Sequence, residues 1–186
     1  PNSVKDIFKD IKIIAEALDV VDKGADLIDF MKNRIRSLKK SYDDKSELTV
    51  AAIEWIDPLM AAGNWVPELI EIAGGVNLFG EAGKHSPWME YKDLIEKDPH
   101  TIIIMPCGYN IQKSIIEIDS LIKQKDWKEI NAVQNDKVYI TDGNQFFNRP
   151  GPRIIESLEI LIEIFHNDKT DFKHIDSGWI KFNSKN

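Results

Sequence analysis

Three short apolar runs, separated by segments with helical periodicity, constrain the fold of this chain more than any other feature. The runs cover residues 48–55, 101–105 and 137–140. Each is short and rich in apolar or β-branched residues, which is typical of strands buried on both faces. Strands that alternate with helices predict an α/β fold with a mostly parallel sheet and helices on both faces.

Two long helical patterns precede the first strand and stand outside this alternation. Ser3, followed three residues later by Asp6, predicts a capped start for the first helix. Its apolar stripe consists of Val4, Ile7, Phe8, Ile11, Ile14 and Leu18. A break precedes residues 23–24, and a second helix is predicted from about residue 25 to 40. We expect the two helices to be a connector that arrives from a segment further upstream.

Helices are also predicted in the second half of the chain. Isoleucines with helical spacing indicate one amphipathic helix over residues 111–122. A last helix follows Pro152, with its apolar residues facing inward and Glu156, Glu159 and Glu163 facing outward. The tail, residues 167–186, has aromatic residues among polar ones. It is expected to form a surface flap or to be partly disordered.

Composition excludes several classes of protein. The net charge of −7 argues against general affinity for nucleic acid. The single cysteine, Cys107, excludes an intramolecular disulfide framework, and the four histidines lack metal-ligand spacing, so no metal or other cofactor is expected. No apolar run approaches the roughly 20 residues of a membrane span. The chain has no signal peptide, but it starts at Pro1, so a missing signal does not indicate a cytoplasmic location.

The loops after the three predicted strands carry the residues that suggest a ligand site. Ligands of open α/β sheets bind just past the carboxyl ends of the strands, where these loops meet. Trp55 and Trp65 are large aromatic residues in the first loop, and Asp57 lies between them. Such residues in a loop suggest a ligand surface. The alternative is that either tryptophan caps the core.

Five blocks of the sequence resemble a known family. They read EWIDP (residues 54–58), GNWVPE (63–68), AGG (73–75), PCG (106–108) and NRPGPR (148–153). In this order and spacing they resemble the cobalamin-binding branch of the substrate-binding proteins of ABC importers. This helical-backbone class also serves ferric siderophores and haem. The resemblance covers roughly residues 1–166.

The resemblance implies a domain organisation and a location. Such proteins have two Rossmann-like lobes joined by one bridging helix, and they hold the ligand between the lobes. Residues 1–20 would be the end of the first lobe, residues 21–47 the bridging helix, residues 48–166 the second lobe, and residues 167–186 a tail. The rest of the first lobe and any signal or anchor would be missing from this sequence. The resemblance also implies an extracytoplasmic location, periplasmic or at the cell surface.

The resemblance assigns candidate roles to individual residues. The wall facing a corrinoid, a vitamin B12-like molecule, would include Trp55, Met60, Trp88, Gln145, Phe146, Phe147 and Arg149. Arg149 beside two phenylalanines suits planar stacking or hydrogen bonding, with a structural role on loop carbonyls as the alternative. Glu90 or Asp93 would dock the protein onto an ABC permease. No catalytic residue is implied.

Three other hypotheses stay open at this point. A ferric siderophore or haem could replace the corrinoid, although siderophore sites generally need more cationic residues. A small hydrolase or transferase could use Glu54, Asp57 and Cys107, although no histidine adjoins the cysteine to activate it. The fragment could also be only a folding unit that binds nothing alone.

Overall fold

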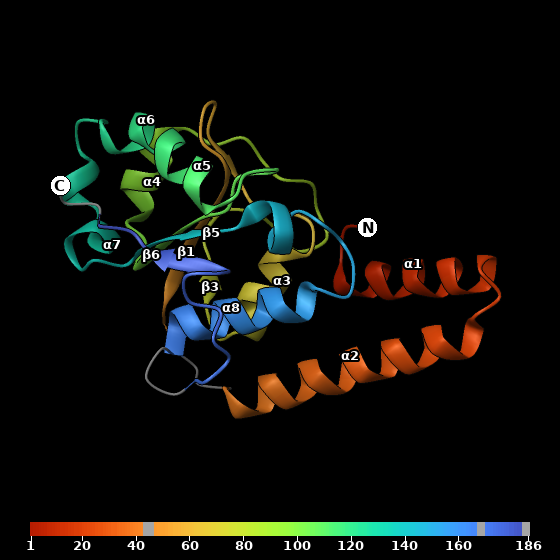
Figure 1. Ribbon diagram of the computed structural model, residues 1–186. Helices are drawn as coiled ribbons and strands as arrows, with labels where there is room; N and C mark the ends of the chain where they lie inside the picture. The colour runs from red at the N-terminus through yellow and green to blue at the C-terminus, as the bar shows by residue number, and fades with distance from the viewer. Residues whose placement is uncertain (43–46, 167–169, 184–186) are drawn as a thin grey trace.

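The structure is a computed structural model that describes residues 1–42, 47–166 and 170–183. Two helices open the chain, α1 (Val4–Ala17) and α2 (Val21–Ser41), and they lie antiparallel on one flank of the lobe (Figure 1). The remaining elements form one sheet with helices on both faces, which confirms the predicted α/β class. The expected span of the bridging segment, to residue 47, includes residues 43–46, which lie outside the described residues.

The described residues form a six-stranded sheet with a parallel centre. Strands β1 (Thr49–Trp55), β4 (Thr101–Ile104) and β5 (Val138–Thr141) pair in parallel, in the order expected for consecutive βαβ units. Short strand β3 (Val76–Asn77) joins β1 in parallel. Strands β2 (Met60–Ala61) and β6 (Trp179–Lys181) are antiparallel and close the two edges. The three predicted strands are therefore confirmed, and the edge strands are additions.

Two hydrophobic cores, one on each face of the sheet, hold the layers together. Helices α3 (Val66–Ile72) and α8 (Ile154–His166) pack with α1 and α2 on one face. The opposite face carries α4 (Tyr91–Lys97), α5 (Ile111–Glu117), α6 (Asp119–Ile122), the 3-10 turn η1 (Trp127–Glu129) and α7 (Asn131–Gln134). Because side chains alternate along a strand, Ile103 of β4 enters the first core and Ile102 and Ile104 enter the second. This burial on both faces explains the unbroken apolar run.

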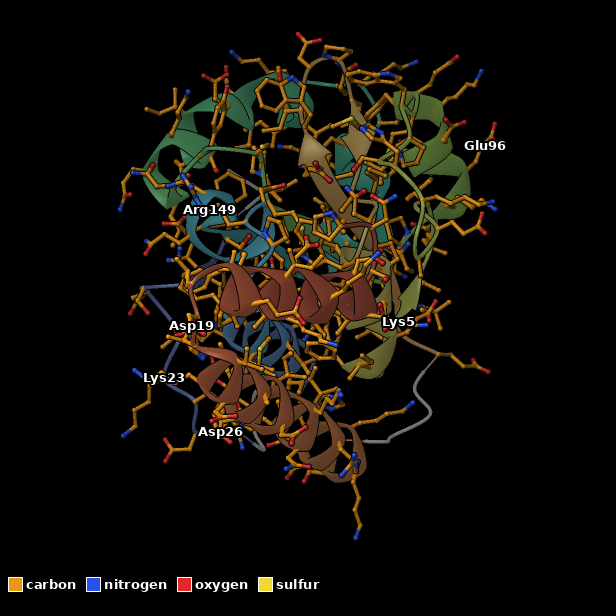
Figure 2. The ribbon with its side chains drawn as sticks, turned by 90° about the vertical axis from the view of Figure 1, so that its right-hand side faces the viewer. Lys5, Asp19, Lys23, Asp26, Glu96 and Arg149 are labelled. Atoms are coloured by element: carbon orange, nitrogen blue, oxygen red, sulfur yellow. The ribbon has the colours of Figure 1, made fainter. Side chains whose placement is uncertain are left out.

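The connector helices differ from the prediction in two ways. Gly24 does not break the chain but lies buried inside α2, where an added Cβ would sit 2.4 Å from the Cβ of Ala15. This glycine therefore lets α1 and α2 approach closely. Ile14 and Leu18 of the expected stripe are exposed, Leu18 by 67%. The reason is visible in Figure 1, where the second half of α1 extends past the sheet and packs only on α2. Asp19 lies in the turn between α1 and α2, and Lys23 lies in the first turn of α2 (Figure 2).

The helix expected over residues 111–122 is broken. Helix α5 ends at Glu117, and α6 begins at Asp119. Ile118 caps both pieces and is fully buried, so the interruption falls at a residue anchored in the core. Periodicity alone does not show such a break, because the apolar spacing continues across it.

The structure differs most from the prediction at the tail and at the outer face of α8. The described part of the tail is ordered by β6, which pairs with β5 and covers the edge of the sheet. Glu163, expected on the outside, is 5% exposed and accepts a hydrogen bond from Trp179 Nε1 at 2.8 Å. Glu159 is also partly buried, and Arg34 and His174 flank its carboxylate. Both glutamates face inward because the tail and α2 cover that side of α8.

Candidate functional site

The carboxyl ends of β1, β4 and β5 meet at one edge of the sheet, as predicted. The main chain ties the first two loops together, since Cys107 N donates to Glu54 O at 3.1 Å. It also ties the last two together, since Asn144 N donates to Tyr109 O at 3.1 Å. Asn148 Nδ2 adds a hydrogen bond to Met105 O at 3.0 Å. The three loops therefore form one continuous surface.

A short hairpin after β1 aligns three of the predicted ligand residues. Trp55 of β1 lies opposite Met60 of β2, and Met60 in turn forms a β-bridge with Trp88. Directly opposed residues of antiparallel neighbours project from the same face, so these side chains form a lateral row. Trp88 is 66% exposed, an unusual position for so large an aromatic group. We call Trp55, Met60 and Trp88 the aromatic row.

Tyr109, which sequence reasoning left out of the site, extends this surface. Its ring centroid lies 5.3 Å from that of Trp55, at an interplanar angle of 56°. Lys113 of α5 places its Nζ 3.6 Å from the tyrosine centroid, a cation–π contact. The signal for Tyr109 was present in the sequence, because it is an aromatic residue just past the end of a predicted parallel strand.

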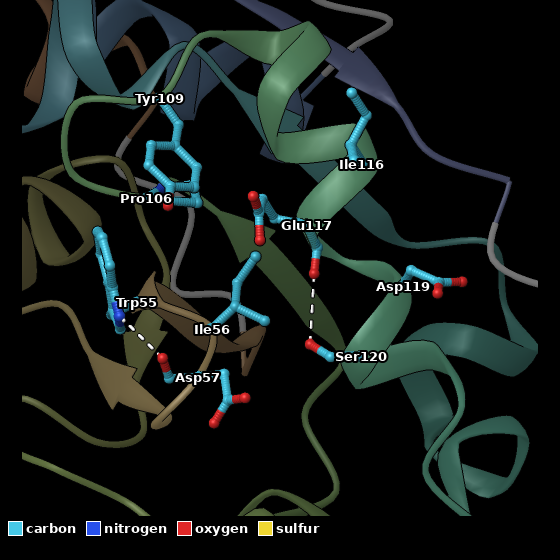
Figure 3. Close-up of a pocket in the computed structure, with 9 residues that line it drawn as sticks. All are labelled: Trp55, Ile56, Asp57, Pro106, Tyr109, Ile116, Glu117, Asp119 and Ser120. Carbon is cyan, nitrogen blue, oxygen red and sulfur yellow. Dashed lines mark hydrogen bonds between the residues drawn. The ribbon is translucent and has the colours of Figure 1, made fainter.

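A cavity of about 280 Å³ opens beside Trp55 and Tyr109 (Figure 3). Its lining includes Ile56, Ile116 and Pro106, with the carboxylates of Asp57, Glu117 and Asp119 at the margin. Among the described residues that line it, none is lysine or arginine. Trp55 Nε1 donates to Asp57 O at 3.0 Å, so the indole is held against its own turn. The cavity thus combines aromatic walls with acceptor groups.

The loop after β5 is a single π-helical turn, η2 (Gly143–Phe147). Asp142 caps this turn, since its two carboxylate oxygens accept hydrogen bonds from Gln145 N and Gln145 Nε2, each at 2.8 Å. A Cβ on Gly143 would lie 2.4 Å from Pro106 O, so only glycine allows this loop to pack against the loop after β4. Gln145 remains exposed on this turn.

Arg149 stands at the end of the same loop. Its Nε donates to Asn144 O and its Nη2 to Asn144 Oδ1, both at 2.9 Å. This is the carbonyl-bracing role that sequence reasoning weighed as the alternative. The guanidinium is nevertheless exposed, so donors beyond these two are open to solvent.

Two predicted wall residues lie in the core instead. Trp65 is 7% exposed and Phe147 is 1% exposed, and both belong to the core under α3 and α8. Trp65 follows Asn64, which adopts a positive φ of 55°, and Trp65 itself stands at the N-cap of α3. Phe146, the neighbour of Phe147, is half-buried and contacts the ring of His174. The two phenylalanines are therefore adjacent in η2, but only Phe147 is fully buried in the core.

The candidate catalytic group of Glu54, Asp57 and Cys107 is not assembled as a reactive set. Glu54 accepts a hydrogen bond from Ser86 Oγ at 2.7 Å, and that hydroxyl accepts from Gly63 N at 3.1 Å, so the carboxylate organises a loop. Partial burial and the nearby Glu54 charge raise the pKa of the Cys107 thiol, against the opposing influence of Arg149. A raised pKa keeps the thiol protonated at neutral pH and therefore weakly nucleophilic. Among the described residues, no cluster of histidine, cysteine and carboxylates suits a metal ion.

The two predicted docking carboxylates, Glu90 and Asp93, cap the start of α4. Asp93 Oδ2 accepts Glu90 N at 2.8 Å, and Glu90 pairs with Lys92 at 2.8 Å on the surface. A second hollow, lined by Phe79, Trp88 and Met89, runs along this helix, with Asp93 and Glu96 beside it. Trp88 therefore joins the aromatic row to the surface of α4.

None of the described helices is both long and apolar enough to cross a membrane.

Comparison with known proteins places this geometry in a family. The chain is 25% identical over 171 residues to an uncharacterised ABC transporter substrate-binding lipoprotein of Bacillus subtilis (strain 168), covering 89% of this chain and 52% of that protein. It is 29% identical over 101 residues to the vitamin B12-binding protein of Vibrio cholerae, covering 54% of this chain and 33% of that one. The chain thus spans about half the length, or less, of these curated relatives.

A solved structure shows the same fold. IsdE of Staphylococcus aureus, complexed with haem, superposes with a TM-score of 0.76 at 19% identity, covering 89% of this chain and 66% of that chain. Residues 1–144 match the periplasmic binding protein family. Because that match covers most of the sequence, the chain belongs to the periplasmic binding protein family.

Proposed function

We propose that this chain is the second lobe and bridging helix of an ABC importer's substrate-binding protein, and that it holds a corrinoid at the carboxyl edge of its sheet. The observation that carries the proposal is the aromatic row of Trp55, Met60 and Trp88, extended by Tyr109. These large apolar side chains stand on an edge that the family fold uses for ligands. Their exposure is costly unless a partner covers them.

The chemistry of a corrinoid suits this surface. A corrinoid is a broad, flat and partly apolar macrocycle with amide groups around its rim. Aromatic walls would bury the ring, and a few polar groups would orient it, as in most small-molecule sites. Gln145 and Arg149 stand exposed on the neighbouring loop, where amide and guanidinium donors would meet the amide carbonyls of the ligand.

Ferric siderophores and haem are the alternative ligands within the same class. IsdE, a protein of the same fold, was solved in complex with haem, so haem is a candidate ligand. Both alternatives bring anionic groups to the site, but the cavity beside Trp55 is lined by the carboxylates of Asp57, Glu117 and Asp119, of which Asp119 pairs with Lys123. Carboxylates repel anions and accept hydrogen bonds from amides. The charge pattern therefore favours a neutral, amide-bearing ligand.

The partner would be an ABC permease, and the protein would work outside the cytoplasm. The B. subtilis relative is a lipoprotein of an ABC transporter, which supports both points. Glu90 and Asp93 at the start of α4 stay the proposed docking groups on this lobe. Any connection to the membrane would run through the permease or through a lipid anchor.

Binding without chemical turnover is part of the proposal. Glu54 is occupied by Ser86, and the pKa of the Cys107 thiol is raised by burial, which leaves the hydrolase or transferase reading without an activated group. If Asp57 were a catalytic acid or base, Asp57→Asn would abolish turnover of ester or amide substrates. We expect the unmodified protein to show no such turnover to abolish.

The test is a titration of the chain with cyanocobalamin, read by tryptophan fluorescence. Saturable quenching is expected, and Trp55→Ala should raise the dissociation constant roughly tenfold, equivalent to about 1.4 kcal/mol. Phe30→Ala is the matched control, because Phe30 is an exposed aromatic residue on α2, remote from the sheet edge. Saturation by haemin or a ferric siderophore, with none by cyanocobalamin, would replace the corrinoid assignment with one of those ligands.

A further inference from the structure

The described part of the tail, residues 170–183, makes contacts that no role in ligand binding explains so far. We call this segment the C-terminal strap. Its strand β6 pairs with β5, and Gly178 O accepts Asp142 N at 2.9 Å, directly at the cap of the η2 turn. Its Phe172 ring lies 5.5 Å from the guanidinium of Arg34 on α2. The strap therefore touches both the loop that carries Gln145 and the bridging helix.

Glu159 of α8 is the joint between these parts. One of its oxygens accepts Arg34 Nε at 3.0 Å and Arg34 Nη2 at 2.5 Å. Its other oxygen lies 3.0 Å from His174 Nε2 of the strap. A single carboxylate thus binds the bridging helix through one oxygen and the strap through the other. The Glu159 and His174 side chains are only 13% and 16% exposed, so solvent screens their pairing weakly.

His174 also contacts the candidate site. Its ring centroid lies 6.3 Å from that of Phe146 in an edge-to-face arrangement. Its backbone N donates to Glu163 Oε2 at 3.1 Å, and the same oxygen accepts Trp179 Nε1 at 2.8 Å. His174 is consequently fixed at its backbone by α8, and its ring spans from Phe146 to Glu159.

The charges around His174 favour its protonated form. Helix α8 presents Glu156, Glu159 and Glu163, and α2 presents Arg34, while η2 contributes the uncharged Phe146. The hydrogen bond that His174 donates to Glu159, together with the neighbouring carboxylates, raises the pKa of His174, although burial acts in the opposite direction. The pKa of Glu159 is lowered, because the hydrogen bonds from His174 and Arg34 outweigh the effect of burial.

We propose that the C-terminal strap is a pH-sensitive latch, in which charged His174 locks the η2 turn and the bridging helix α2 to the lobe through Glu159. Loss of the proton removes the ionic part of the Glu159 contact and leaves a neutral ring against Phe146. A latch of this kind would regulate the proposed ligand site, and that consequence rests on the proposed function. The latch itself does not.

The sign of the effect follows from linkage. A histidine whose folded pKa exceeds its unfolded value stabilises the latched form fully below the unfolded pKa. That stabilisation is lost as the pH rises through the folded pKa. Opening of the latch should therefore increase with pH, about tenfold for every pH unit by which the His174 midpoint exceeds the free-histidine value of about 6.5.

The first experiment is an NMR titration of the histidine rings in the complete chain. The His174 midpoint is expected above that of a free histidine, and Glu159→Gln should lower it while leaving an acceptor for Arg34. A His174 midpoint at or below the free value, or one that Glu159→Gln leaves unchanged, would overturn the latch.

The second experiment is hydrogen exchange at the amides of α2 and η2, corrected for intrinsic rates, below and above the measured midpoint. Opening should rise with pH in the wild type. It should be independent of pH in His174→Gln, whose amide can still donate to Glu159 but does not titrate. His85→Gln is the matched control, because His85 bonds only the adjacent Ser86 O among its described contacts. A pH dependence that survives in His174→Gln would contradict the proposal.

The third experiment separates the latch from the ligand. If cyanocobalamin binds, its dissociation constant should drift with pH in the wild type and stay flat in His174→Gln. A constant value in both proteins would show that the latch does not reach the site. If cyanocobalamin fails to bind, the corrinoid proposal fails, while the titration and exchange experiments still decide the latch.

Discussion

The indole of Trp55 and the ring of Tyr109 lie 5.3 Å apart, centroid to centroid, although Trp55 ends β1 and Tyr109 follows β4. Their contact exists because β1 and β4 are parallel neighbours, with Ile53 opposite Ile104, so that their loops leave the sheet side by side. The pair forms the aromatic end of the cavity in Figure 3. It is therefore the simplest place to test whether the sheet edge binds a ligand.

Tyr109→Ala should weaken both this pair and ligand binding. Aromatic pairs contribute about 0.5–1.5 kcal/mol beyond the area that they bury. We expect the free energy of unfolding to fall by roughly 1 kcal/mol in urea titrations. The affinity for cyanocobalamin should fall by a similar amount. Tyr109→Phe keeps the ring and should resemble the wild type in both measurements; a loss as large as that of the alanine variant would assign the effect to the hydroxyl instead.

Trp179→Phe should destabilise the fold by removing one donor from a buried carboxylate. Trp179 Nε1 donates to Glu163 Oε2 at 2.8 Å, and Glu163 is 5% exposed. Hydrogen bonds to charged groups contribute about 1.5–3 kcal/mol, so a loss of that order is expected in the free energy of unfolding. Trp88→Phe makes the same change at an exposed position and should alter stability by less than about 0.5 kcal/mol. Equal losses in the two variants would rule out the buried hydrogen bond as the cause.

Gly24→Ala should destabilise the chain even though alanine is the better helix former by about 1 kcal/mol. The new methyl group would meet the Cβ of Ala15 at 2.4 Å and force α1 away from α2. The matched control is Gly151→Ala, because an added Cβ there meets no atom within 4 Å. Thermal unfolding should show a lower midpoint for Gly24→Ala and an unchanged or higher one for Gly151→Ala. A stabilised Gly24→Ala variant would mean that the two helices are free to separate.

At neutral pH, Cys107 should react with iodoacetamide more slowly than an ordinary exposed thiol does. Burial of the sulfur and the adjacent Glu54 raise its pKa, so a smaller fraction is thiolate than in a free cysteine. The alkylation rate should increase with pH and reach half of its maximum above the midpoint of N-acetylcysteine measured in parallel. Glu54→Gln should lower that midpoint. A midpoint below that of N-acetylcysteine would restore Cys107 as a candidate nucleophile.

The strands and their carboxyl-end loops could be predicted from the sequence because each strand is buried on both faces and so has a continuous apolar run. Trp88 is exposed in a loop outside any periodic pattern, whereas Trp55, the last residue of β1, is half-buried. Trp65 and Phe147 were wrong as wall residues, since one residue of difference in a turn decides whether a side chain points out or into the core. Sequence spacing does not encode that direction.

The sequence predicted only a surface flap or partial disorder for the tail, and the contacts of the strap could not be predicted. Arg34 and Glu159 are 125 residues apart in the chain, and only the packing of α2 on α8 brings them together. Glu163 looked like one of three solvent-facing glutamates until Trp179 and the backbone of His174 covered it.

The sequence by itself determined the α/β class, the three central strands and the edge at which their loops meet, because local apolar patterns and parallel connections allow few arrangements. Tertiary structure alone decided which aromatic residues share a face, which carboxylates are buried and where the tail lies. Those outcomes depend on contacts between segments far apart in the chain, and their energies are set by burial and pairing rather than by local pattern.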